Sequence, residues 1–358
     1  MKLSREYDIA VYGASSFTAK FVIEQLMETD YKVILAARNK NKIHKSCFDT
    51  FSCSSENISE LTSKASVLIN LAGPYIESGI DIIEACIKTQ THYVDITGEV
   101  NFIKKAKEFH QEARRNNVTC IQSCGFDSIP SDLGAFYLAK HFETCEIKSE
   151  IVDGNVILNT GTWLSLLSSL RSFKNKDVTR KKEPLISYHK DYAAIKWFGP
   201  DAFVVRQSAE ELKNLFKYTF TMSMRVKSKL YLYLVMFYMF LITKLVHYNL
   251  FYALFRRFPR IFSFGLFRNK PDEKQLKKGF FKIEMTAVGQ IMNKTKTKKL
   301  LIEGGDPGYE STSIFVTQCA FQLLKNKNKI ASGVQTPAAA LYKTNIIECI
   351  KEKGIKFI

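Results

Sequence analysis

The sequence lacks the features that would indicate a metal-binding or disulfide-stabilised protein. Among its eight cysteines no pair has C-x-x-C spacing, and no cysteine–histidine pattern has the spacing of zinc ligands. Cys86, Cys120 and Cys319 lie in apolar runs, which is typical of reduced, buried thiols. No hydrophobic leader precedes the first strand-like run. We therefore expect no metal site. Together with the apolar segment and the family resemblance described below, the missing leader predicts a location on the cytosolic face of membranes or lipid droplets.

Acidic residues are also few relative to basic ones. The chain has 35 Asp and Glu against 52 Lys and Arg, a formal net charge of +17. Such an excess favours partners that carry phosphate: a phosphorylated cofactor, an anionic membrane or nucleic acid. The basic residues are scattered and form no recognisable nucleic-acid-binding module. A specific nucleic-acid partner is therefore not expected, and a basic solvated surface explains the charge equally well.

The first 130 residues alternate between strand-like and helix-like patterns. The predicted strands are 7–13, 32–38, 66–73, 92–98 and 118–124, and the predicted helices are 18–27, 58–64, 80–88 and 100–115. Strands this apolar are typical of a parallel sheet covered on both faces. Successive β–α–β units therefore predict an α/β fold with an N-terminal Rossmann-type domain over 1–130.

The rest of the chain predicts a second, mixed α/β domain. We expect a helix at 132–142, strands near 147–158, 217–226 and 280–289, a hairpin tip at 293–299, and a helix at 310–324. We assign 131–334 to this substrate and dimerisation domain, which would support a homodimer. The last segment, 335–358, is expected to pack back on the first domain.

One apolar segment, 229–258, breaks the pattern of the second domain. Its uncharged core, 230–243, is too short to cross a hydrocarbon layer of ~30 Å as one helix. It is rich in Tyr and Phe and is bounded by Lys and Arg. This composition predicts two helices, hinged near 244–249, that lie in one leaflet of a membrane with cations at the headgroups. A buried helix or an oligomer interface is the alternative.

The loop "GASSFTA" at Gly13 follows the first strand and precedes the first helix. Gly13 permits the tight turn of a phosphate-binding loop, and Ala19 is accepted where the helix packs on the strand. Ser16 stands where close approach to a diphosphate is wanted, but its hydroxyl can donate to a phosphate oxygen. We predict that the cofactor-binding residues of this loop are Gly13, Ala14, Ser15, Ser16, Phe17 and Thr18. The alternative is a structural turn without a ligand.

The end of the second strand indicates which dinucleotide would bind. An acidic residue there usually holds the ribose hydroxyls of NAD, but this chain has Ala37, Arg38, Asn39 and Lys40. Arg38 and Lys40 suit a 2′-phosphate. NADP is therefore predicted over NAD, with two solvated cations as the alternative.

The loop after the third predicted strand lies at the carboxyl edge of the sheet, where ligands bind in open α/β folds. Ala72, Gly73 and Pro74 are expected to shape the wall beside the nicotinamide. Tyr75 is a candidate proton donor, or a stacking residue. Gly73 and Pro74 also fit a simple turn.

Acidic residues follow the next two strands. Glu99 is expected to cap the helix that follows it or to act as an acid–base group. Asp127 is a candidate catalytic residue that orients the nicotinamide or holds the domain junction. Ser131 or Asp132 is expected to cap the next helix, after Pro130.

Three of these stretches together resemble a known family. "YDIAVYGASSFTAKFV", "LINLAGPYIESGIDIIEACIKTQTHYVDITGE" and "GFDSIPSDLG" resemble the saccharopine dehydrogenase-like oxidoreductases, which include bacterial trans-acting enoyl reductases. The family loop usually reads G-A-[ST]-G-F-T-G, so Ser16 and Ala19 replace two glycines. The resemblance implies a Rossmann domain joined to a saccharopine-reductase-like domain, oxidoreductase activity and association with membranes or lipid droplets. In some branches it also implies a role in lipid or glycolipid synthesis.

These observations predict an NADP-dependent oxidoreductase. Its expected substrate is a hydrophobic, lipid-related carbonyl or enoyl compound at a membrane or lipid-droplet surface. The alternative, motivated by Ser16 and Ala19, is a non-catalytic membrane-associated protein that retains the Rossmann fold.

Overall fold

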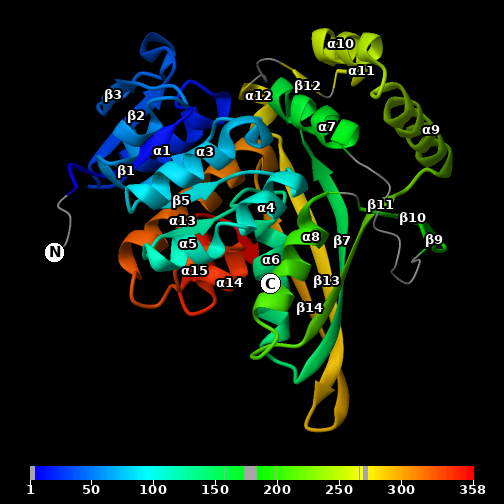
Figure 1. Ribbon diagram of the computed structural model, residues 1–358. Helices are drawn as coiled ribbons and strands as arrows, with labels where there is room; N and C mark the ends of the chain where they lie inside the picture. Colours follow the sequence, from blue (N-terminus) through cyan, green and yellow to red (C-terminus); the bar gives the residue numbers. More distant parts are fainter. Residues whose placement is uncertain (1–4, 157, 173–183, 198, 266, 269–272) are drawn as a thin grey trace.

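A computed structural model describes residues 5–156, 158–172, 184–197, 199–265, 267–268 and 273–358. The chain forms two seven-stranded sheets that lie side by side and are joined by buried helices (Figure 1). The mixed α/β architecture confirms the predicted fold class. A third, two-stranded sheet belongs to an outlying group of helices described below.

The first sheet is parallel, with strand order β15-β6-β5-β4-β1-β2-β3. Its strands are β1 (Tyr7–Tyr12), β2 (Val33–Ala37), β3 (Asp49–Ser52), β4 (Ala65–Asn70), β5 (His92–Asp95), β6 (Thr119–Ile121) and β15 (Gly333–Gln335). All five residues of β2 are buried, as the apolar runs predict for a sheet covered on both faces. The Rossmann-type domain is therefore confirmed.

Helices cover both faces of this sheet. One apolar core contains side chains from α1 and α13, and the other contains side chains from α2, α3, α4 and α5. The bounds are α1 (Phe17–Met27), α2 (Ile58–Thr62), α3 (Tyr75–Lys88), α4 (Val100–Lys107), α5 (His110–Arg115) and α13 (Thr312–Lys325), with a short 3₁₀ helix η1 (Lys40–Lys42) after β2. The helix predicted at 100–115 is divided into α4 and α5, and α3 begins five residues before the predicted start at Ile80.

The second sheet has the order β16-β14-β13-β7-β11-β10-β9. Its strands are β7 (Thr144–Asn155), β9 (Ile186–Tyr188), β10 (Ala193–Lys196), β11 (Tyr218–Val226), β13 (Phe280–Ile291), β14 (Lys294–Gly304) and β16 (Lys356–Phe357). Helices α6 (Ile129–Ala139) and α8 (Asp201–Glu211) lie against the long strands (Figure 1). The hairpin tip is narrower than predicted, since Met292 and Asn293 alone form the left-handed turn, with φ of 50° and 59°, and the lysines of 294–299 belong to β14.

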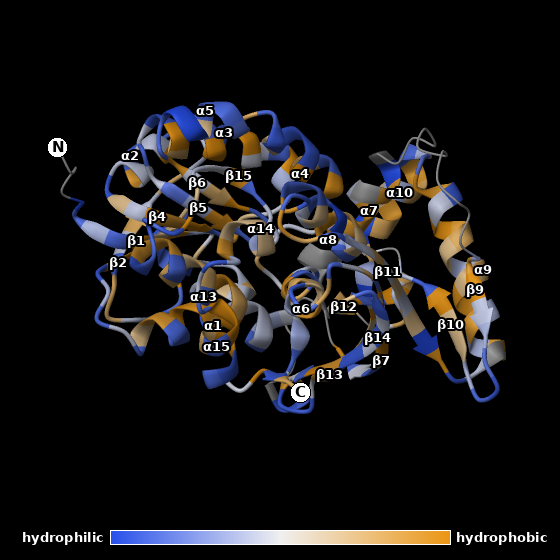
Figure 2. Ribbon diagram, turned by 90° about the horizontal axis from the view of Figure 1, so that it is seen from below, coloured by the Kyte–Doolittle hydropathy of each residue, from blue (hydrophilic) through white to orange (hydrophobic). Residues whose placement is uncertain are grey.

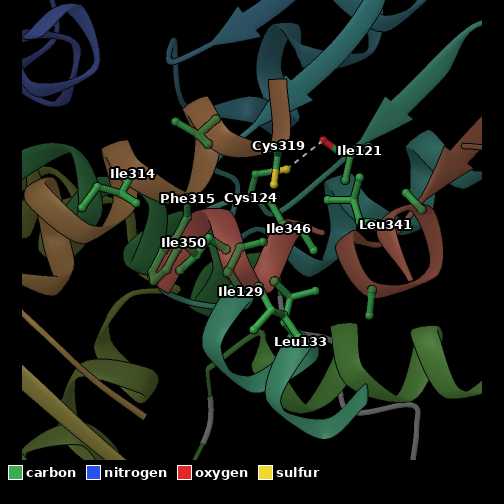
Figure 3. Close-up of a cluster of buried hydrophobic side chains, with 14 of the residues drawn as sticks. Ile121, Cys124, Ile129, Leu133, Ile314, Phe315, Cys319, Leu341, Ile346 and Ile350 are labelled. Carbon is green, nitrogen blue, oxygen red and sulfur yellow. Dashed lines mark hydrogen bonds between the residues drawn. The ribbon is translucent and has the colours of Figure 1, made fainter. Parts of the chain in front are cut away.

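The predicted second domain, 131–334, ends too late. After β14 a π-helix η2 (Pro307–Ser311) leads into α13, which packs on α1, β4 and β5, so the chain has already returned to the first domain. Helices α14 (Pro337–Leu341) and α15 (Ile346–Glu352) then pack with α6 and α13 in one apolar cluster (Figure 3). The final strand β16 pairs with β14 of the second sheet, so segment 335–358 contacts both domains.

An outlying group of helices projects from the second sheet (Figure 2). It comprises α7 (Thr160–Ser172), α9 (Lys229–Leu245), α10 (Asn249–Arg257), α11 (Pro259–Phe262), α12 (Glu273–Leu276) and the paired strands β8 (Leu158–Asn159) and β12 (Phe267–Arg268). Ile242, Val246 and Phe255 pack against Trp163 and Leu167 in a small separate core. Two helices with a break between them are present as predicted, and none of the described helices is long and apolar enough to cross a membrane.

Candidate dinucleotide and domain-junction site

Gly13 is required by a close approach between two chain segments. Its φ is +82°, and a Cβ there would lie 2.8 Å from the backbone of Leu71 and Ala72. The Leu71 N–H donates to the Tyr12 carbonyl at 2.8 Å, which holds the ends of β1 and β4 together. The tight turn predicted at Gly13 is therefore present, and it brings Ala72 against Gly13.

Ser16 is the N-cap of α1. Its Oγ accepts a hydrogen bond from the Ala19 N–H at 3.3 Å, so this hydroxyl is turned onto the helix. The N–H groups of Phe17 and Thr18 belong to the first turn and so have no acceptor within the helix. Ala19 is fully buried against the sheet, as its packing position requires. The loop thus fits a diphosphate, with the Ser16 side chain beside the amides that would hold it.

Arg38 occupies the position expected for a 2′-phosphate ligand. It directly follows β2 and is exposed. Burial raises the pKa of Tyr12, and the positive charge of Arg38 offsets part of that rise, which places the guanidinium near the end of β1. Asn39 caps η1 by accepting from the Asn41 N–H at 3.0 Å, so Lys40 starts a helical turn at the same edge. The role of Arg38 and Lys40 remains a prediction.

Tyr75 is buried at the carboxyl end of β4. Its ring packs 5.7 Å from that of Phe102, and its hydroxyl donates to the Asn70 carbonyl at 3.1 Å. Burial raises the pKa of this phenol well above its usual value. The placement favours the packing role over the proton donor. The preceding Gly73–Pro74 peptide is cis, and these two residues form the turn into α3.

Glu99 caps a different helix from the one predicted. Its carboxylate accepts from the Tyr75 N–H at 3.0 Å and the Ile76 N–H at 2.9 Å, at the N-terminus of α3. It makes no side-chain cap bond to α4, the helix that follows it. The reason is topological: β4 and β5 are neighbours, so the loop after β5 lies beside the helix that follows β4.

Asp127 lies at the domain junction, in the loop after β6. Its side chain is exposed, and desolvation by the surrounding protein raises the pKa of its carboxyl. Gly98 lies close to both sides of the junction, since an added Cβ there would lie 3.3 Å from Asp127 Oδ2 and 3.5 Å from Pro200. The loops after β5 and β6 thus meet the start of α8 here.

Asp201, the first residue of α8, is a second carboxylate at this junction. It is only 3% exposed; its Oδ1 accepts from Ser131 Oγ at 2.9 Å and its Oδ2 from Trp197 Nε1 at 2.7 Å. Burial, followed by the charge of Asp127, raises the pKa of this carboxyl to about 7. The sequence analysis missed Asp201 and Trp197, and "WFGPD", a Gly-Pro turn before a helix, was the available signal.

Ser131 and Asp132 do not cap α6. The helix begins at Ile129, so both residues lie inside its first turn and are fully buried. Ser131 bonds to Asp201 as described, and Asp132 Oδ2 accepts from the Ala338 N–H at 2.8 Å. Both side chains therefore join α6 to distant segments.

The segment "DPGY" forms a further wall near the first turn of α1. The Tyr309 ring lies 4.8 Å from that of Phe17 and 5.8 Å from that of Phe21. Thr312 accepts from the Phe126 N–H at 3.1 Å, which attaches the loop after β6 to the same segment. Within the described ranges, no three His, Cys, Asp or Glu side chains come together as metal ligands.

Three features occur together here: a glycine turn at a helix N-terminus, a cation after the second strand, and acidic groups at the junction with a second domain. This combination is typical of two-domain, dinucleotide-dependent oxidoreductases. Comparison with known proteins makes this specific. Residues 9–121 match the family described as the saccharopine dehydrogenase NADP binding domain. The first domain is therefore an NADP-binding domain of the saccharopine dehydrogenase type, and the chain resembles oxidoreductases of that family.

The similarity to individual relatives extends over the whole chain. The human saccharopine dehydrogenase-like oxidoreductase is 28% identical, and the match covers 99% of this chain and 97% of the relative. A Mycobacterium tuberculosis protein named as a trans-acting enoyl reductase is 25% identical over 94% of each chain. Among solved structures, apo saccharopine dehydrogenase (L-Glu forming) from Saccharomyces cerevisiae has a TM-score of 0.58 at 14% identity, covering 98% of this chain and 100% of that one, which shows a shared fold.

Proposed function

We propose that this NADP-binding protein is an oxidoreductase that reduces a hydrophobic, lipid-related carbonyl or enoyl compound at the cytosolic surface of a membrane or lipid droplet. The observation that carries the proposal is the apolar outer surface of α9 and α10, which belongs to the same domain as Asp201. The enoyl reductase name of one relative supports the reaction class.

The outer surface of α9 and α10 exposes an unusual amount of apolar area. Leu230 is 72% exposed, Phe237 62% and Leu250 68%. The other large apolar side chains exposed on these helices and beside them are Tyr231, Tyr233, Leu234, Phe240, Leu241, Tyr248, Phe258, Ile261 and Phe264. A soluble monomer rarely leaves such a contiguous patch in water.

Cations flank this surface, as they do in helices that lie in the headgroup region. Lys244 ends α9, and Arg256 and Arg257 end α10. Aromatic side chains between such cations favour a lipid interface over a protein interface. A homodimer through the same face is the other arrangement that would cover it.

The residues present fit NADP(H). When bound, NADPH would supply a hydride. The first-turn amides of α1 and the Gly13 turn would hold the diphosphate, Arg38 would bind the 2′-phosphate, and Ala72, Gly73 and Pro74 would line the nicotinamide side.

The second requirement of a reduction is a proton, and the domain junction can hold one. Burial raises the pKa of both Asp127 and Asp201, and the charge of Asp127 adds to the rise at Asp201. Both carboxyls therefore hold a proton to a higher pH than an exposed aspartate would. Asp127, the exposed member, would deliver that proton to the substrate, while Trp197 and Ser131 hold Asp201 in place.

Turnover of NADPH with vesicles containing long-chain carbonyl or 2-enoyl lipids tests the proposal. Asp127→Asn should lower kcat at least 100-fold, the scale of general acid catalysis, with unchanged NADPH affinity. The exposed Asp153→Asn is the matched control. A wild-type protein that binds NADPH but turns over no member of the panel would leave the non-catalytic alternative.

Vesicle flotation tests the membrane surface separately. Phe237→Glu combined with Phe240→Glu should release the protein from anionic vesicles, because each change places a charge in the apolar layer. Met292→Glu, at an 85% exposed position on the distant β13–β14 turn, should have no effect. Equal flotation of the two variants would refute membrane contact through α9.

A further inference from the structure

Four of the outlying helices, α7, α9, α10 and α11, carry cations but no acidic residue. Between Glu211 and Asp272 the sequence contains no Asp or Glu, and α9, α10 and α11 all lie within that interval. The sequence of α7 contains none either. The arginines and lysines of these helices therefore have no acidic neighbour on their own helix or on the other three. Charge of a single sign attracts partners of the opposite sign from outside the chain.

Two of these cations meet at one aromatic ring. The guanidinium carbon of Arg171, in the last turn of α7, lies 4.2 Å from the centroid of the Tyr252 ring in α10. The guanidinium carbon of Arg256 lies 5.5 Å from the same centroid. Asn249, Tyr252 and Arg256 are spaced i, i+3 and i+7 on α10. They therefore share one face of that helix, and this face contacts Arg171.

Hydrogen bonds between α7 and α10, which pack on each other (Figure 1), hold this arrangement in place. Trp163 Nε1 in α7 donates to the Phe255 carbonyl in α10 at 2.8 Å, within the small core of these helices. Arg171 Nη2 donates to Asn249 Oδ1 at 2.5 Å. The relative position of the two guanidinium groups is therefore fixed by the packing of α7 on α10.

The two guanidinium groups suit a phosphate that carries two negative charges. A guanidinium over a ring keeps the N–H donors at its edge for an anion, and its planar set of five donors matches two oxygens of a phosphate. Two cations beside one ring also repel each other, and a bound dianion removes that repulsion. A phosphate monoester carries a charge of about −1.5 to −2 at neutral pH, whereas a phosphate diester carries only one negative charge.

The surroundings of this pair indicate a lipid as the source of the phosphate. Tyr248 is 64% exposed and Leu250 68%, on either side of Asn249, and both belong to the apolar surface assigned above to membrane contact. We propose that Arg171 and Arg256 bind the phosphate monoester headgroup of an anionic phospholipid, with Tyr248 and Leu250 at its acyl chains. The inference rests on that membrane contact and adds a choice of lipid to it.

Flotation of the full-length protein with two kinds of vesicle tests the site. One kind contains phosphatidic acid, a monoester, and the other has equal surface charge from phosphatidylserine, a diester. We expect about tenfold tighter binding to phosphatidic acid, the effect of one additional hydrogen bond between charged groups. Arg256→Gln should abolish this preference. Arg257→Gln, which removes the neighbouring exposed cation of the same helix, should retain it.

Arg171 provides a second variant, which separates hydrogen-bond geometry from charge. Arg171→Lys keeps the positive charge but cannot offer two parallel N–H donors to one phosphate. The preference for phosphatidic acid should therefore fall in this variant too, while its binding to phosphatidylserine vesicles should equal that of the wild type. Retention of the full preference in Arg171→Lys would show that Arg171 acts only through its charge and would overturn the site.

Three further results would overturn the proposal. The first is equal binding of the wild type to the two kinds of vesicle, and the second is equal preference in Arg256→Gln and Arg257→Gln. The third is displacement from phosphatidic acid vesicles by soluble glycerol 3-phosphate, because the phosphate alone would then suffice. Binding to phosphatidylserine vesicles measures membrane contact by itself, so loss of the preference is distinguishable from failure of the proposed membrane location.

Discussion

At the scale of single residues, Gly13 decides whether the nucleotide edge can form. A Cβ there would meet the backbone of Leu71 and Ala72 at 2.8 Å, in addition to the strain of a φ of +82°. Gly13→Ala should therefore cost more than the ~1–3 kcal/mol of backbone strain alone and abolish NADPH binding. Gly354→Ala separates the two effects, since Gly354 has a φ of +94° and open space around it. Equal losses of stability in thermal unfolding of Gly13→Ala and Gly354→Ala would show that the contact with the loop after β4 is unimportant.

Ser16 is the second residue whose effect can be stated in advance. Its hydroxyl bonds to the Ala19 N–H, in the space where a glycine would admit a phosphate. Ser16→Gly should tighten NADPH binding several-fold, while loss of the cap costs only a few tenths of a kcal/mol. Fluorescence titration measures this change, with Ser228→Gly, which removes the serine N-cap of α9, as control. Weaker binding in Ser16→Gly would mean that the hydroxyl contacts the phosphate, as the sequence suggested.

At the scale of elements, α3 depends on a residue from a different β–α unit. Glu99→Ala would leave the N–H groups of Tyr75 and Ile76 without their acceptor, at a cost of about 2–3 kcal/mol in unfolding free energy. Glu99→Gln should lose less, since it keeps one acceptor. Denaturant unfolding measures both. The control is Glu77→Ala, which removes an exposed acid in the first turn of α3. An equal loss of unfolding free energy in this control would show that Glu99 acts only through its negative charge near the helix N-terminus.

The elements also show where sequence reasoning stops. Periodicity predicted β1, β2, β4, β5 and the two apolar helices α9 and α10, because their patterns follow from local burial. It could not predict β15, which has three residues and joins the first sheet only after six of the seven strands of the second sheet. The candidate site likewise has one part that was predictable from sequence and one part that was not. The loop at Gly13 is contiguous and was recognisable, whereas Asp201 reaches Ser131 across 70 positions of chain.

The capping errors have the same origin. Glu99, Ser131 and Asp132 were all assigned to the nearest helix start, which is the best local choice. In the fold each side chain instead bonds to an element that is distant in sequence, because adjacent strands and packed helices bring other helix ends closer. Recognising such residues requires the topology, and no spacing rule supplies it.

At the scale of the whole molecule, the domains are joined by buried acids in a strongly basic chain. Asp132 is fully buried between α6 and the start of α14, and burial raises the pKa of its carboxyl to about 7. Burial has the same effect at Asp95 and Asp201. Because burial favours the protonated form of these carboxyls, they contribute little negative charge to a chain whose formal net charge is +17. They make the stability of the joined domains depend on pH.

The direction of that dependence follows from proton linkage. An unfolded Asp has a pKa of about 3.9, so between about pH 4 and 7 the folded protein binds more protons at Asp132 than the unfolded chain does. Its stabilising contribution is complete below pH 4 and is lost as the pH rises through about 7. Asp132→Asn keeps an oxygen for the Ala338 N–H and removes the titration. At pH 8 the unfolding free energy of the variant should therefore exceed that of the wild type by on the order of 2–4 kcal/mol, and its melting temperature should be higher. At pH 4 the two proteins should differ little. Calorimetry from pH 4 to 8 measures this, with the exposed Asp81→Asn as control; a parallel pH dependence in wild type and Asp132→Asn would show that Asp132 is ionised in the folded protein.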